Sequence, residues 1–582
     1  MHSDLNKKLA LCAGLAAASA PSLLAYNIAP SPTFLNPALA LGLWGAFVAL
    51  CRPWGSPAHL GKAGPLLAAL ALLIVPGLLV SVQQGLPASL ALSTLGLLLA
   101  TAVLVAGGVA VGGETGAVET FAIFCWAWLW AGVLNTLVAA VQVFTPELAD
   151  GNWIAASGIV GRAVGNLRQP NHLSSLLLWS CIGAVALLEL RRLTRWQATL
   201  ATTAFIFAVV LTASRTGLVS VALLGLWGLL DRKLSRPARL LLLSTPLIYA
   251  LCWWGMAQWA ALAEHSFGGT ARLNESDISG SRFGIWKNTW ALILAHPWWG
   301  VGFGEFNLAW TLTPFPGRPT AFFDHTHNLP LQLAVELGLP LAALVLGLLL
   351  WAMARAGISA WQSESDTGSA KRCAWMMVLM IGLHSLLEYP LWYAYFLLPT
   401  AWALGFALQA PVAPKPSRPR VETGWRQASL GMAGWLLAAG AVFSIWDYSR
   451  VAAIFTANPG DPPLEERIAR GQRSVFFAHH ADYAAVTSGV TQADPARAFD
   501  RASHYLLDTR LMTAWAQSLA ERGELDAARH LAARLREFNK VDAEELFEPC
   551  PAEAVAVAPG LPFQCELPSR VMSWQEFLPK PK

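Results

Sequence analysis

Apolar runs long enough to cross a membrane recur along the chain from Leu9 to about Trp446. Each holds about 17 to 25 residues, the length that an α-helix needs to cross a hydrocarbon core of about 30 Å. We count about thirteen such runs. Hydrophobic residues make up 55% of the chain and charged residues only 13%, a composition outside the range of ordinary soluble proteins. The sequence therefore predicts an all-α polytopic membrane protein.

The distribution of lysine and arginine predicts the orientation, because short cytoplasmic connections retain cations. The connection near Glu114 carries no cation, but the alternation on both sides of it agrees. The N-terminus is then cytoplasmic, and everything after Trp446 is external. The basic connections are Lys7/Lys8, Arg52/Lys62, Arg191/Arg192/Arg195, Arg232/Lys233/Arg236/Arg239, Arg355/Lys371/Arg372 and Lys415/Arg418/Arg420/Arg426.

Two simpler interpretations of these features are set aside. The first apolar run, with "ASA" at Ala18 to Ala20, has the features of a cleaved signal peptide, but in a polytopic protein such a run is expected to stay as the first span. The net charge of +4 is explained by the topology signal. It therefore gives no reason to expect a nucleic-acid partner, and the partner implied by the composition is the lipid bilayer.

Composition divides the chain into four parts. Residues 1–410 form a polytopic membrane domain with external loops at about 145–170 and 259–326, residues 411–427 a Pro-rich cytoplasmic linker, residues 428–446 the last span, and residues 447–582 an external soluble domain. Within the last part, two runs of helical periodicity flank the turn "RGEL" and resemble one tetratricopeptide-like helix pair. One such unit buries its apolar face poorly, so we expect it to pack on neighbouring helices or on a partner.

The cysteines fall into two groups. Cys550 and Cys565 lie in the external domain, where a disulfide is chemically possible, and the sequence leaves open whether they are bonded. The other cysteines lie in or beside apolar runs, where a thiol behaves as a small hydrophobe: Cys12, Cys51, Cys125, Cys181, Cys252 and Cys373.

Charges at the external face are informative because the topology does not call for them there. For Arg162, Arg272 and Arg318 we expect interfacial side chains that reach the lipid headgroups. Arg215 differs, because the tight connection "TASRTG" has no long loop to solvate a charge, so it needs an anionic partner or water. The remaining external candidates are Arg168, Arg282, Lys287, Asp324, His325, His327 and Glu388.

The stretch "DHTHNLPLQLAVELG" places an acid and two histidines against the tenth apolar run. Asn328 and Pro330 predict the start of a helix that runs inward from the external face. Its N-terminal end carries roughly half a positive charge and favours an anion such as phosphate. Glu336, about 13 Å further along the helix, is expected to brace the bundle.

Asp324, His325 and His327 also allow two other interpretations. A carboxylate beside an HxH pattern is able to ligate a metal, although no second ligand cluster follows in the external loops. Alternatively, one of the histidines only caps the interface. We expect no metal or other cofactor.

Several motifs resemble the O-antigen ligase and polymerase superfamily (Wzy_C, WaaL-like). The motifs on which this resemblance rests are "SRTG", "SRFGIWKNTW", "HPWWGVGFGEF", and "HN" at His327 and Asn328 followed by Gly338. Three further stretches, together with the extra span and soluble tail, are similar to the PglL-type protein O-oligosaccharyltransferases: "GNLRQPNHLSSLLLW", "DHTHNLPLQLAVELGLP" and "HSLLEYPLWYAYF". The motifs cover about residues 150–410. Leu341 departs from the ligase form of the motif, which favours the protein-glycosylating branch or has no meaning.

The resemblance implies a GT-C-like ligase fold in a bacterial inner membrane. It implies transfer of a preassembled glycan from undecaprenyl-pyrophosphate to a Ser or Thr hydroxyl of a periplasmic protein such as a pilin. By motif, His327 corresponds to the essential histidine, which suits a general base, and Arg215 and Arg282 to arginines that engage the pyrophosphate. The residues expected to bind and position substrate are Arg168, Gln169, Asn171, His325, Asn328 and Glu388.

Two rival functions remain open at this stage. A ligase that attaches O-antigen to lipid A core, or a polymerase that extends it, differs only in the acceptor, and the soluble tail favours a protein acceptor. A lipid-linked glycan flippase predicts inverted repeats and ionisable groups at mid-membrane, which we do not see. The identity of the glycan, the acceptor proteins and the oligomeric state are not encoded in a recognisable pattern.

Overall fold

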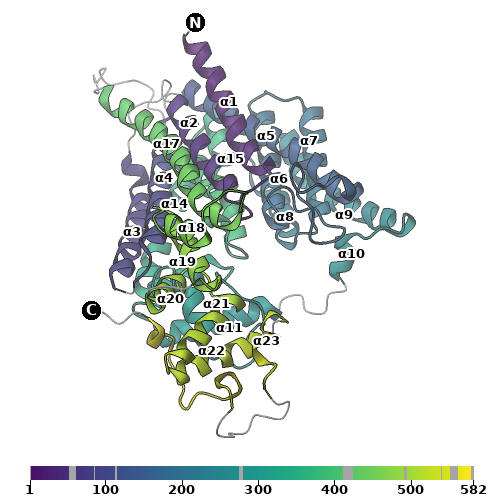
Figure 1. Cartoon of the computed structure of the whole chain (residues 1–582). Helices are drawn as coiled ribbons and strands as arrows, with labels where there is room; N and C mark the ends of the chain where they lie inside the picture. Colours follow the sequence, from purple (N-terminus) through teal and green to yellow (C-terminus); the bar gives the residue numbers. More distant parts are fainter. Residues whose placement is uncertain are drawn as a thin grey trace. The chain divides into compact units, whose positions relative to one another are not determined.

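The computed structural model describes residues 2–51, 60–83, 85–111, 114–273, 280–409, 424–490, 494–538, 541–550 and 561–578. These residues divide into two compact units. The first unit holds residues 1–70, 97–278 and 347–445, and the second holds residues 71–96, 279–346 and 446–582. Figure 1 labels the helices, and each unit is described by itself.

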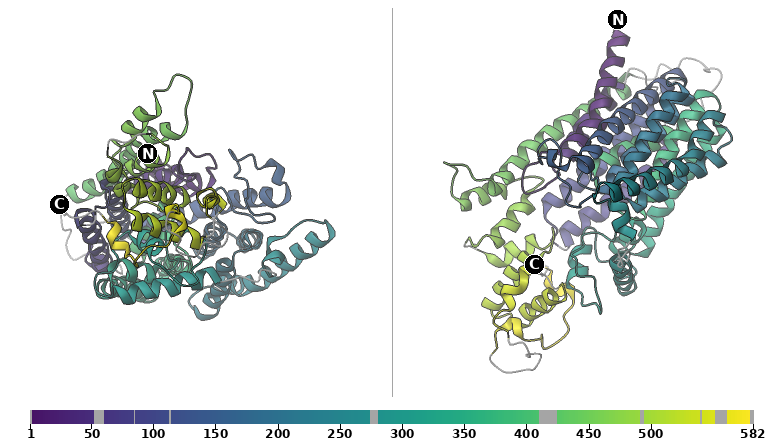
Figure 2. Two further views of the ribbon diagram at one scale, coloured as in Figure 1. Left: turned by 60° about the horizontal axis from the view of Figure 1, so that its bottom comes forward. Right: turned by 90° about the vertical axis from the view of Figure 1, so that its right-hand side faces the viewer.

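The first unit is a bundle of long helices (Figure 2). Its core contains an aromatic cluster in which Trp44, Phe124, Trp128, Trp179 and Trp402 stack or meet edge to face. The helices are α1 (His2–Leu23), α2 (Leu35–Cys51), α5 (Glu114–Phe144), α6 (Pro170–Glu189), α7 (Arg195–Thr212), α8 (Arg215–Leu230), α9 (Arg236–Leu262), α10 (Gly268–Leu273), α15 (Ser365–Ser385), α16 (Ala394–Ala407), and parts of α4 (Ala88–Ala110), α14 (Leu339–Gln362) and α17 (Gly424–Phe455).

Helix α6 is the central element of the first unit, because 89% of the residues in its apolar stretch are buried inside the protein. It packs on α5, α7 and α15. Its polar groups find partners inside the bundle, since Ser180 donates to the carbonyl of Trp128 at 2.7 Å and the Trp179 indole donates to the carbonyl of Met377 at 2.9 Å. Twenty helical residues at 1.5 Å each span about 30 Å, so α6 connects opposite ends of the unit.

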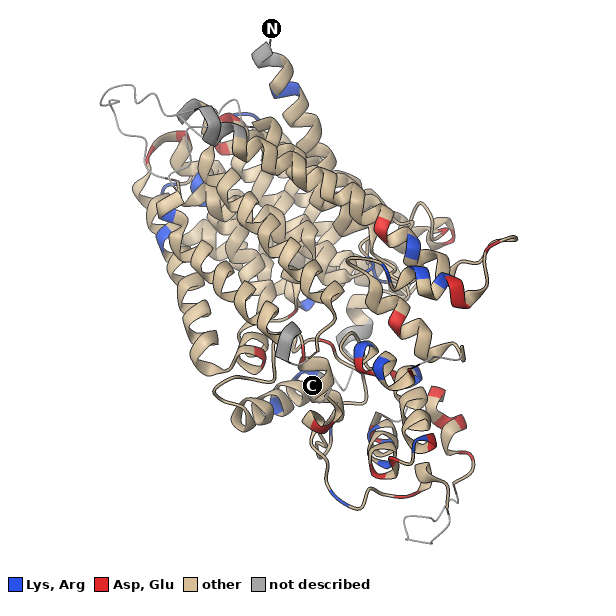
Figure 3. Cartoon of the chain, turned by 60° about the vertical axis from the view of Figure 1, so that its left-hand side comes forward, with Lys and Arg blue, Asp and Glu red and all other residues tan. Residues whose placement is uncertain are grey.

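The membrane class predicted from the sequence is confirmed. Among the described residues, eight helices are long and apolar enough to cross a membrane. Three shorter apolar helices accompany them at Leu35–Cys51, Arg215–Leu230 and Ala394–Ala407. Figure 3 shows that the long helices carry almost no charge along their middle parts. The total of about thirteen spans stays a prediction.

The second unit combines part of the predicted external loop with the soluble tail. One hydrophobic core joins Ile285, Trp310 and Val335 from the loop region to Trp515 and Phe538 from the tail. The helices are α11 (Gly280–Ala295), α12 (Phe306–Leu312), α13 (Leu329–Leu337), α18 (Leu464–Gly471), α19 (Ala478–Thr487), α20 (Pro495–Ala502), α21 (Thr509–Glu521), α22 (Leu525–Phe538) and α23 (Glu544–Phe547), together with most of α3 (Gly64–Gln83) and the remaining parts of α4, α14 and α17.

One local expectation for the tail region is met, and one open question about its cysteines is answered. The predicted helix pair is α21 and α22, joined through Gly523, whose φ of 80° suits glycine. A disulfide joins Cys550 to Cys565. The tetratricopeptide likeness stays a prediction. The Pro-rich linker lies outside the described residues as far as residue 423, and the last apolar helix, α17, begins at Gly424 and ends at Phe455, beyond the expected end at Trp446.

The helix that was expected to run inward from Asn328 is shorter than predicted. Helix α13 ends at Leu337, and α14 begins a new helix at Leu339. The break is at Gly338, which has φ of 76° and lies so close to Trp298 that a Cβ atom there would meet its carbonyl oxygen at 2.3 Å. Only glycine fits this position, and the His327 segment is thus followed by a separate helix of nine residues that ends at this break.

Candidate functional site

In the first unit, candidate residues from three separate stretches meet at the start of α6. Gln169 is the N-cap of this helix, and its side chain accepts hydrogen bonds from the backbone N–H groups of Asn171 and His172. Asn171 donates from Nδ2 to Oε1 of Glu388 at 3.0 Å, and its Oδ1 accepts from the Ser214 hydroxyl at 2.6 Å. One asparagine therefore links the start of α6, the turn before α8 and the segment after α15.

Arg215 is positioned by this network. Ser214 is the N-cap of α8 and accepts from the N–H of Gly217 at 2.9 Å, so Arg215 is the first residue of the helix. The turn is tight, because α7 ends at Thr212 and Ala213 has φ of 47°. The expectation that Arg215 lies in a two-helix hairpin is met. Ser214 is a contact residue that the sequence reasoning missed, although "TASRTG" has the form of a capped helix start.

Arg168 has an unusual left-handed backbone conformation as well as a charged side chain. Its φ is 58°, and its guanidinium donates to the carbonyl of Ala25 at 3.0 Å. A left-handed non-glycine residue directly before a helix cap is uncommon, and its surroundings must hold it in place. Arg168, Gln169, Asn171, Arg215 and Glu388 therefore come from segments that the fold of the first unit brings together.

In the second unit, the His327 segment is fixed by hydrogen bonds from both sides. Asn328 caps α13 by accepting from the N–H of Leu331 at 3.0 Å, as predicted. The backbone N–H of Thr326 donates to the Gln332 side chain at 2.8 Å. The backbone carbonyl of Thr326 accepts from the indole of Trp286 at 2.9 Å. His327 lies between these anchored residues with φ of 54°, a conformation that its neighbours must hold.

Arg282 comes to the same region of the second unit through α11. It lies one helical turn before Trp286, on the same face of the helix. Because the Trp286 indole bonds the residue next to His327, the segments that carry Arg282 and His327 meet at this bond. The ring of Phe323 meets the His327 imidazole edge to face, with 5.6 Å between ring centroids. Trp286, Thr326 and Gln332 were not identified from the sequence.

The side chains of His325 and Asp324 are in contact beside this segment. Nδ1 of His325 lies 3.0 Å from a carboxylate oxygen of Asp324. Desolvation raises the pKa of the Asp324 carboxyl, but the charge and hydrogen bond of His325 outweigh it and keep that pKa below its ordinary value. In the part of the chain that the structure describes, no group of three or more His, Cys, Asp or Glu side chains is arranged to hold a metal ion.

Glu336 is buried on α13 within the second unit, and its expected role of bracing the bundle stays a prediction. Its carboxylate accepts from the Gln332 side chain at 2.9 Å and from the backbone of Gly304. Burial raises the pKa of Glu336 to about 7, against the opposing effect of these hydrogen bonds and of His325. The helix that carries it lies outside the membrane-spanning helices.

A prediction about pH follows from Glu336. Its folded-state pKa of about 7 exceeds the ordinary 4.5, so its contribution to stability is full below pH 4.5 and is lost as the pH rises through 7. The Glu336→Gln variant cannot ionise. We expect it to match the wild type in thermal unfolding at pH 5 and to exceed it at pH 8, by up to about 3 kcal/mol. A stability difference that is constant from pH 5 to pH 8 would contradict this account.

Two arginines assigned to the lipid interface are instead buried, which corrects the expectation. Arg162 is 4% exposed and donates from Nε to the carbonyl of Thr212 at 2.9 Å. Arg318 is 7% exposed and pairs with Glu537 at 3.2 Å. In both cases a partner distant in sequence compensates for the lost hydration, and no local pattern reveals such a partner. The side chain of Arg272 lies outside the described residues.

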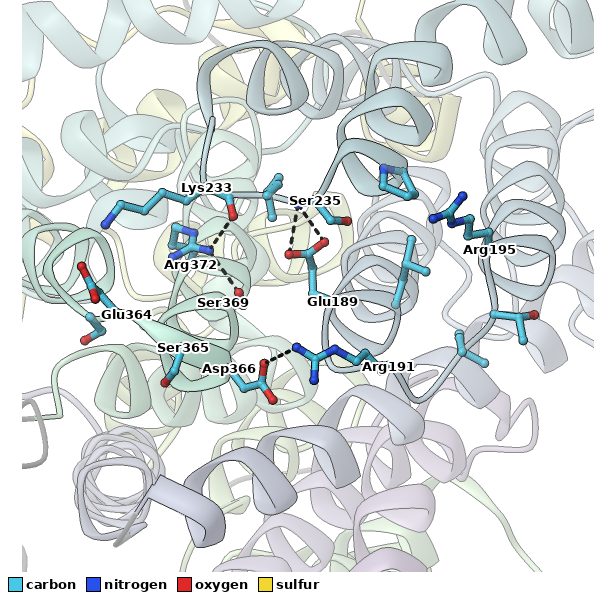
Figure 4. Close-up of a pocket in the computed structure, with 16 residues that line it drawn as sticks. Glu189, Arg191, Arg195, Lys233, Ser235, Glu364, Ser365, Asp366, Ser369 and Arg372 are labelled. Carbon is cyan, nitrogen blue, oxygen red and sulfur yellow. Dashed lines mark hydrogen bonds and ion pairs between the residues drawn. The ribbon is translucent and has the colours of Figure 1, made fainter.

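A pocket of about 760 Å³ lies at the other end of α6 in the first unit. Figure 4 shows Arg191 paired with Asp366, and Glu189 accepting from the backbone N–H of Ser235. Two charged groups of the lining, Arg191 and Asp366, thus bind each other, and Glu189 bonds the backbone. The pocket is formed by three of the basic connections predicted to be cytoplasmic, at residues 188–195, 233–237 and 363–372, which confirms that these connections share one end of the bundle.

Family models match three stretches of the chain. The protein glycosylation ligase model (PglL_A) matches residues 163–188, the O-antigen ligase model (Wzy_C) matches residues 198–346, and a model described as virulence factor membrane-bound polymerase, C-terminal, matches residues 373–546. Every candidate site residue described above lies within one of these stretches. Over these stretches the chain is similar to membrane-bound glycan ligases and polymerases.

Two curated relatives narrow this class. The general O-oligosaccharyltransferase of Acinetobacter baylyi is 26% identical over 308 residues, covering 48% of this chain and 51% of that protein. The ComP-specific O-oligosaccharyltransferase of the same organism is 26% identical over 292 residues, covering 48% and 50%. The chain thus aligns with about half the length of these relatives. Together with the family models, they confirm the resemblance to PglL-type protein O-oligosaccharyltransferases of the Wzy_C superfamily.

Proposed function

We propose that this protein is a glycosyltransferase that moves a preassembled oligosaccharide from undecaprenyl-pyrophosphate to Ser or Thr hydroxyls of periplasmic, pilin-like proteins. The observation that carries the proposal is the His327 segment. An imidazole is held in a left-handed turn at the capped start of α13, next to the segment that presents Arg282. The names of the two curated relatives support a protein as the acceptor.

The proposed chemistry is a direct displacement. The acceptor oxygen forms a bond to the anomeric carbon, while the bond between that carbon and the phosphate oxygen breaks. Its electron pair leaves with the pyrophosphate, and the hydroxyl proton passes to His327 as general base. Arg215 and Arg282 stabilise the leaving pyrophosphate, because guanidinium groups bind phosphate oxygens bidentately. This displacement inverts the anomeric configuration.

The other candidate residues take supporting roles in the proposal. Arg168, Gln169, Asn171 and Glu388 position the substrate and the Arg215 turn through the network at the start of α6. His325 and Asn328 flank the base, and His325 contacts Asp324 while Asn328 caps α13. No metal takes part in this scheme.

We further propose that the protein resides in the bacterial inner membrane with its N-terminus in the cytoplasm and its candidate site and tail in the periplasm. Two observations support this orientation. Three basic connections gather at one end of the first unit, as the retention of cations in the cytoplasm requires. The tail carries the Cys550–Cys565 disulfide, which is typical of an oxidising compartment.

The acceptor decides between this function and its nearest rivals, an O-antigen ligase or polymerase. Membranes that contain the wild type are supplied with undecaprenyl-pyrophosphate-linked oligosaccharide and with a purified pilin or lipid A core, each with and without EDTA. We expect glycan on the pilin by intact mass, unaffected by EDTA. A bare pilin with glycosylated lipid A core would replace the proposal with the ligase function, and loss of activity in EDTA would assign a role to a metal.

A further inference from the structure

The soluble tail of the second unit packs on the helix that precedes the His327 segment. The side chains of Glu305 and His504 are both fully buried and lie 2.7 Å apart between Oε1 and Nδ1. Nε2 of His530 lies 2.8 Å from the carbonyl oxygen of Leu312. These contacts join the start of α12 to the region before α21, and the end of α12 to α22.

A second contact joins the tail to the loop between α12 and α13. The guanidinium carbon of Arg318 lies 4.3 Å from the ring centroids of both Trp310 and Phe538. Phe538 also stacks on Phe322 at 4.0 Å between centroids, with an interplanar angle of 20°. The last residue of α22 therefore touches the loop close to its histidines.

Asn307 connects these elements most directly. This side chain is 6% exposed. Its Oδ1 accepts from the N–H of Leu507 in the tail at 2.8 Å, and its Nδ2 donates to the carbonyl of Phe323 at 2.9 Å. Both ends of one amide are thus used, one by the tail and one by the segment that leads to His327.

The bond to Phe323 affects the candidate base because little chain separates them. Phe323 lies four residues before His327, and its ring meets the imidazole edge to face. On the same side of His327, Thr326 is held by Trp286 and Gln332, and on the other side Asn328 caps α13. With Phe323 also fixed, the left-handed turn at His327 has anchored backbone on both sides.

We infer that Asn307 is a positioning residue through which the tail holds the His327 segment in its reactive conformation. This inference rests on the base role proposed for His327. The tail is then a structural part of the site in the second unit. Loss of the Asn307 bond to Phe323 allows the segment to shift, and a shift of about 1 Å at a reacting group is able to cost about 100-fold in rate.

The test uses Asn307→Asp in the full-length protein in lipid nanodiscs. Aspartate has nearly the same shape and still accepts from Leu507, but it cannot donate to Phe323. We expect kcat to fall by about 10- to 100-fold with the KM values for donor and acceptor changed less than twofold. Amide hydrogen exchange at residues 320–328 should accelerate about tenfold or more, while residues 509–538 keep wild-type protection.

Asn458→Asp is the matched control, because Asn458 is an exposed asparagine of the same unit. It should behave as the wild type in both measurements. Unchanged exchange at residues 320–328 in Asn307→Asp overturns the inference, whatever the activity. So does wild-type kcat in Asn307→Asp under conditions where His327→Ala is inactive. If the wild type transfers no glycan to any acceptor, the proposed function fails, and the exchange measurement still decides whether Asn307 holds the segment.

Discussion

Replacing His327 with alanine should lower the rate of glycan transfer by about 10²- to 10⁴-fold, the range that a general base contributes. The reason is local, because the imidazole is presented from a turn that is anchored on both sides by Thr326 and Asn328. Methyl in place of imidazole leaves the acceptor hydroxyl without a group to take its proton. The measurement is the initial rate of oligosaccharide transfer to the acceptor protein, followed by intact mass.

Two control variants distinguish loss of the general base from structural effects of the substitution. His325→Ala removes the neighbouring imidazole, which contacts Asp324, and should lower the rate much less than His327→Ala does. His327→Asn tolerates the left-handed backbone better than alanine does, so it tests whether backbone strain alone explains a loss. If His327→Ala keeps more than a tenth of the wild-type rate, or if His327→Asn restores it, His327 is not the base.

Much of the local structure of the candidate site could be predicted from the sequence. The Asn328 cap, the helix start at Arg215 and the helix pair of the tail each depend on residues a few positions apart. Local rules for caps and turns are sufficient for such features. The break at Gly338 also had a signal that we did not use, since Gly338 followed by Pro340 has the form of a helix end and a new helix start.

The contacts that assemble the site could not be predicted. Asn171 bonds Glu388 across 217 residues, and Asn307 bonds Leu507 across 200. Asparagine has no pattern that marks it as a bridge, because its amide serves equally well in a turn, a cap or a buried network. The burial of Arg318 was missed for the same reason, since Glu537 and Phe538, which cover it together with the nearby Trp310, lie in another part of the chain.

The largest effect on stability is expected from Arg372→Leu, at the end of the first unit that lies away from Asn171. Asp231 is fully buried, and its carboxylate accepts from Nε of Arg372 at 3.1 Å and from the indole of Trp227 at 3.2 Å. Removal of the arginine leaves a buried carboxylate without its counter-charge. Loss of one partner from such a pair costs about 3 to 5 kcal/mol, which unfolding of the purified protein in detergent should reveal.

The same pocket supplies a matched control for this prediction (Figure 4). Arg191 pairs with Asp366 at 3.8 Å, but both side chains are exposed, at 84% and 44%, so Arg191→Leu should change the free energy of unfolding by less than about 1 kcal/mol. Asp231→Asn combined with Arg372→Leu removes the orphaned charge and should recover much of the loss. Because α6 separates this pair from Asn171 by nearly its whole length, the transfer rate per folded molecule should stay at the wild-type value. If Arg372→Leu and Arg191→Leu lower the free energy of unfolding equally, burial does not determine how much an ion pair contributes to stability here.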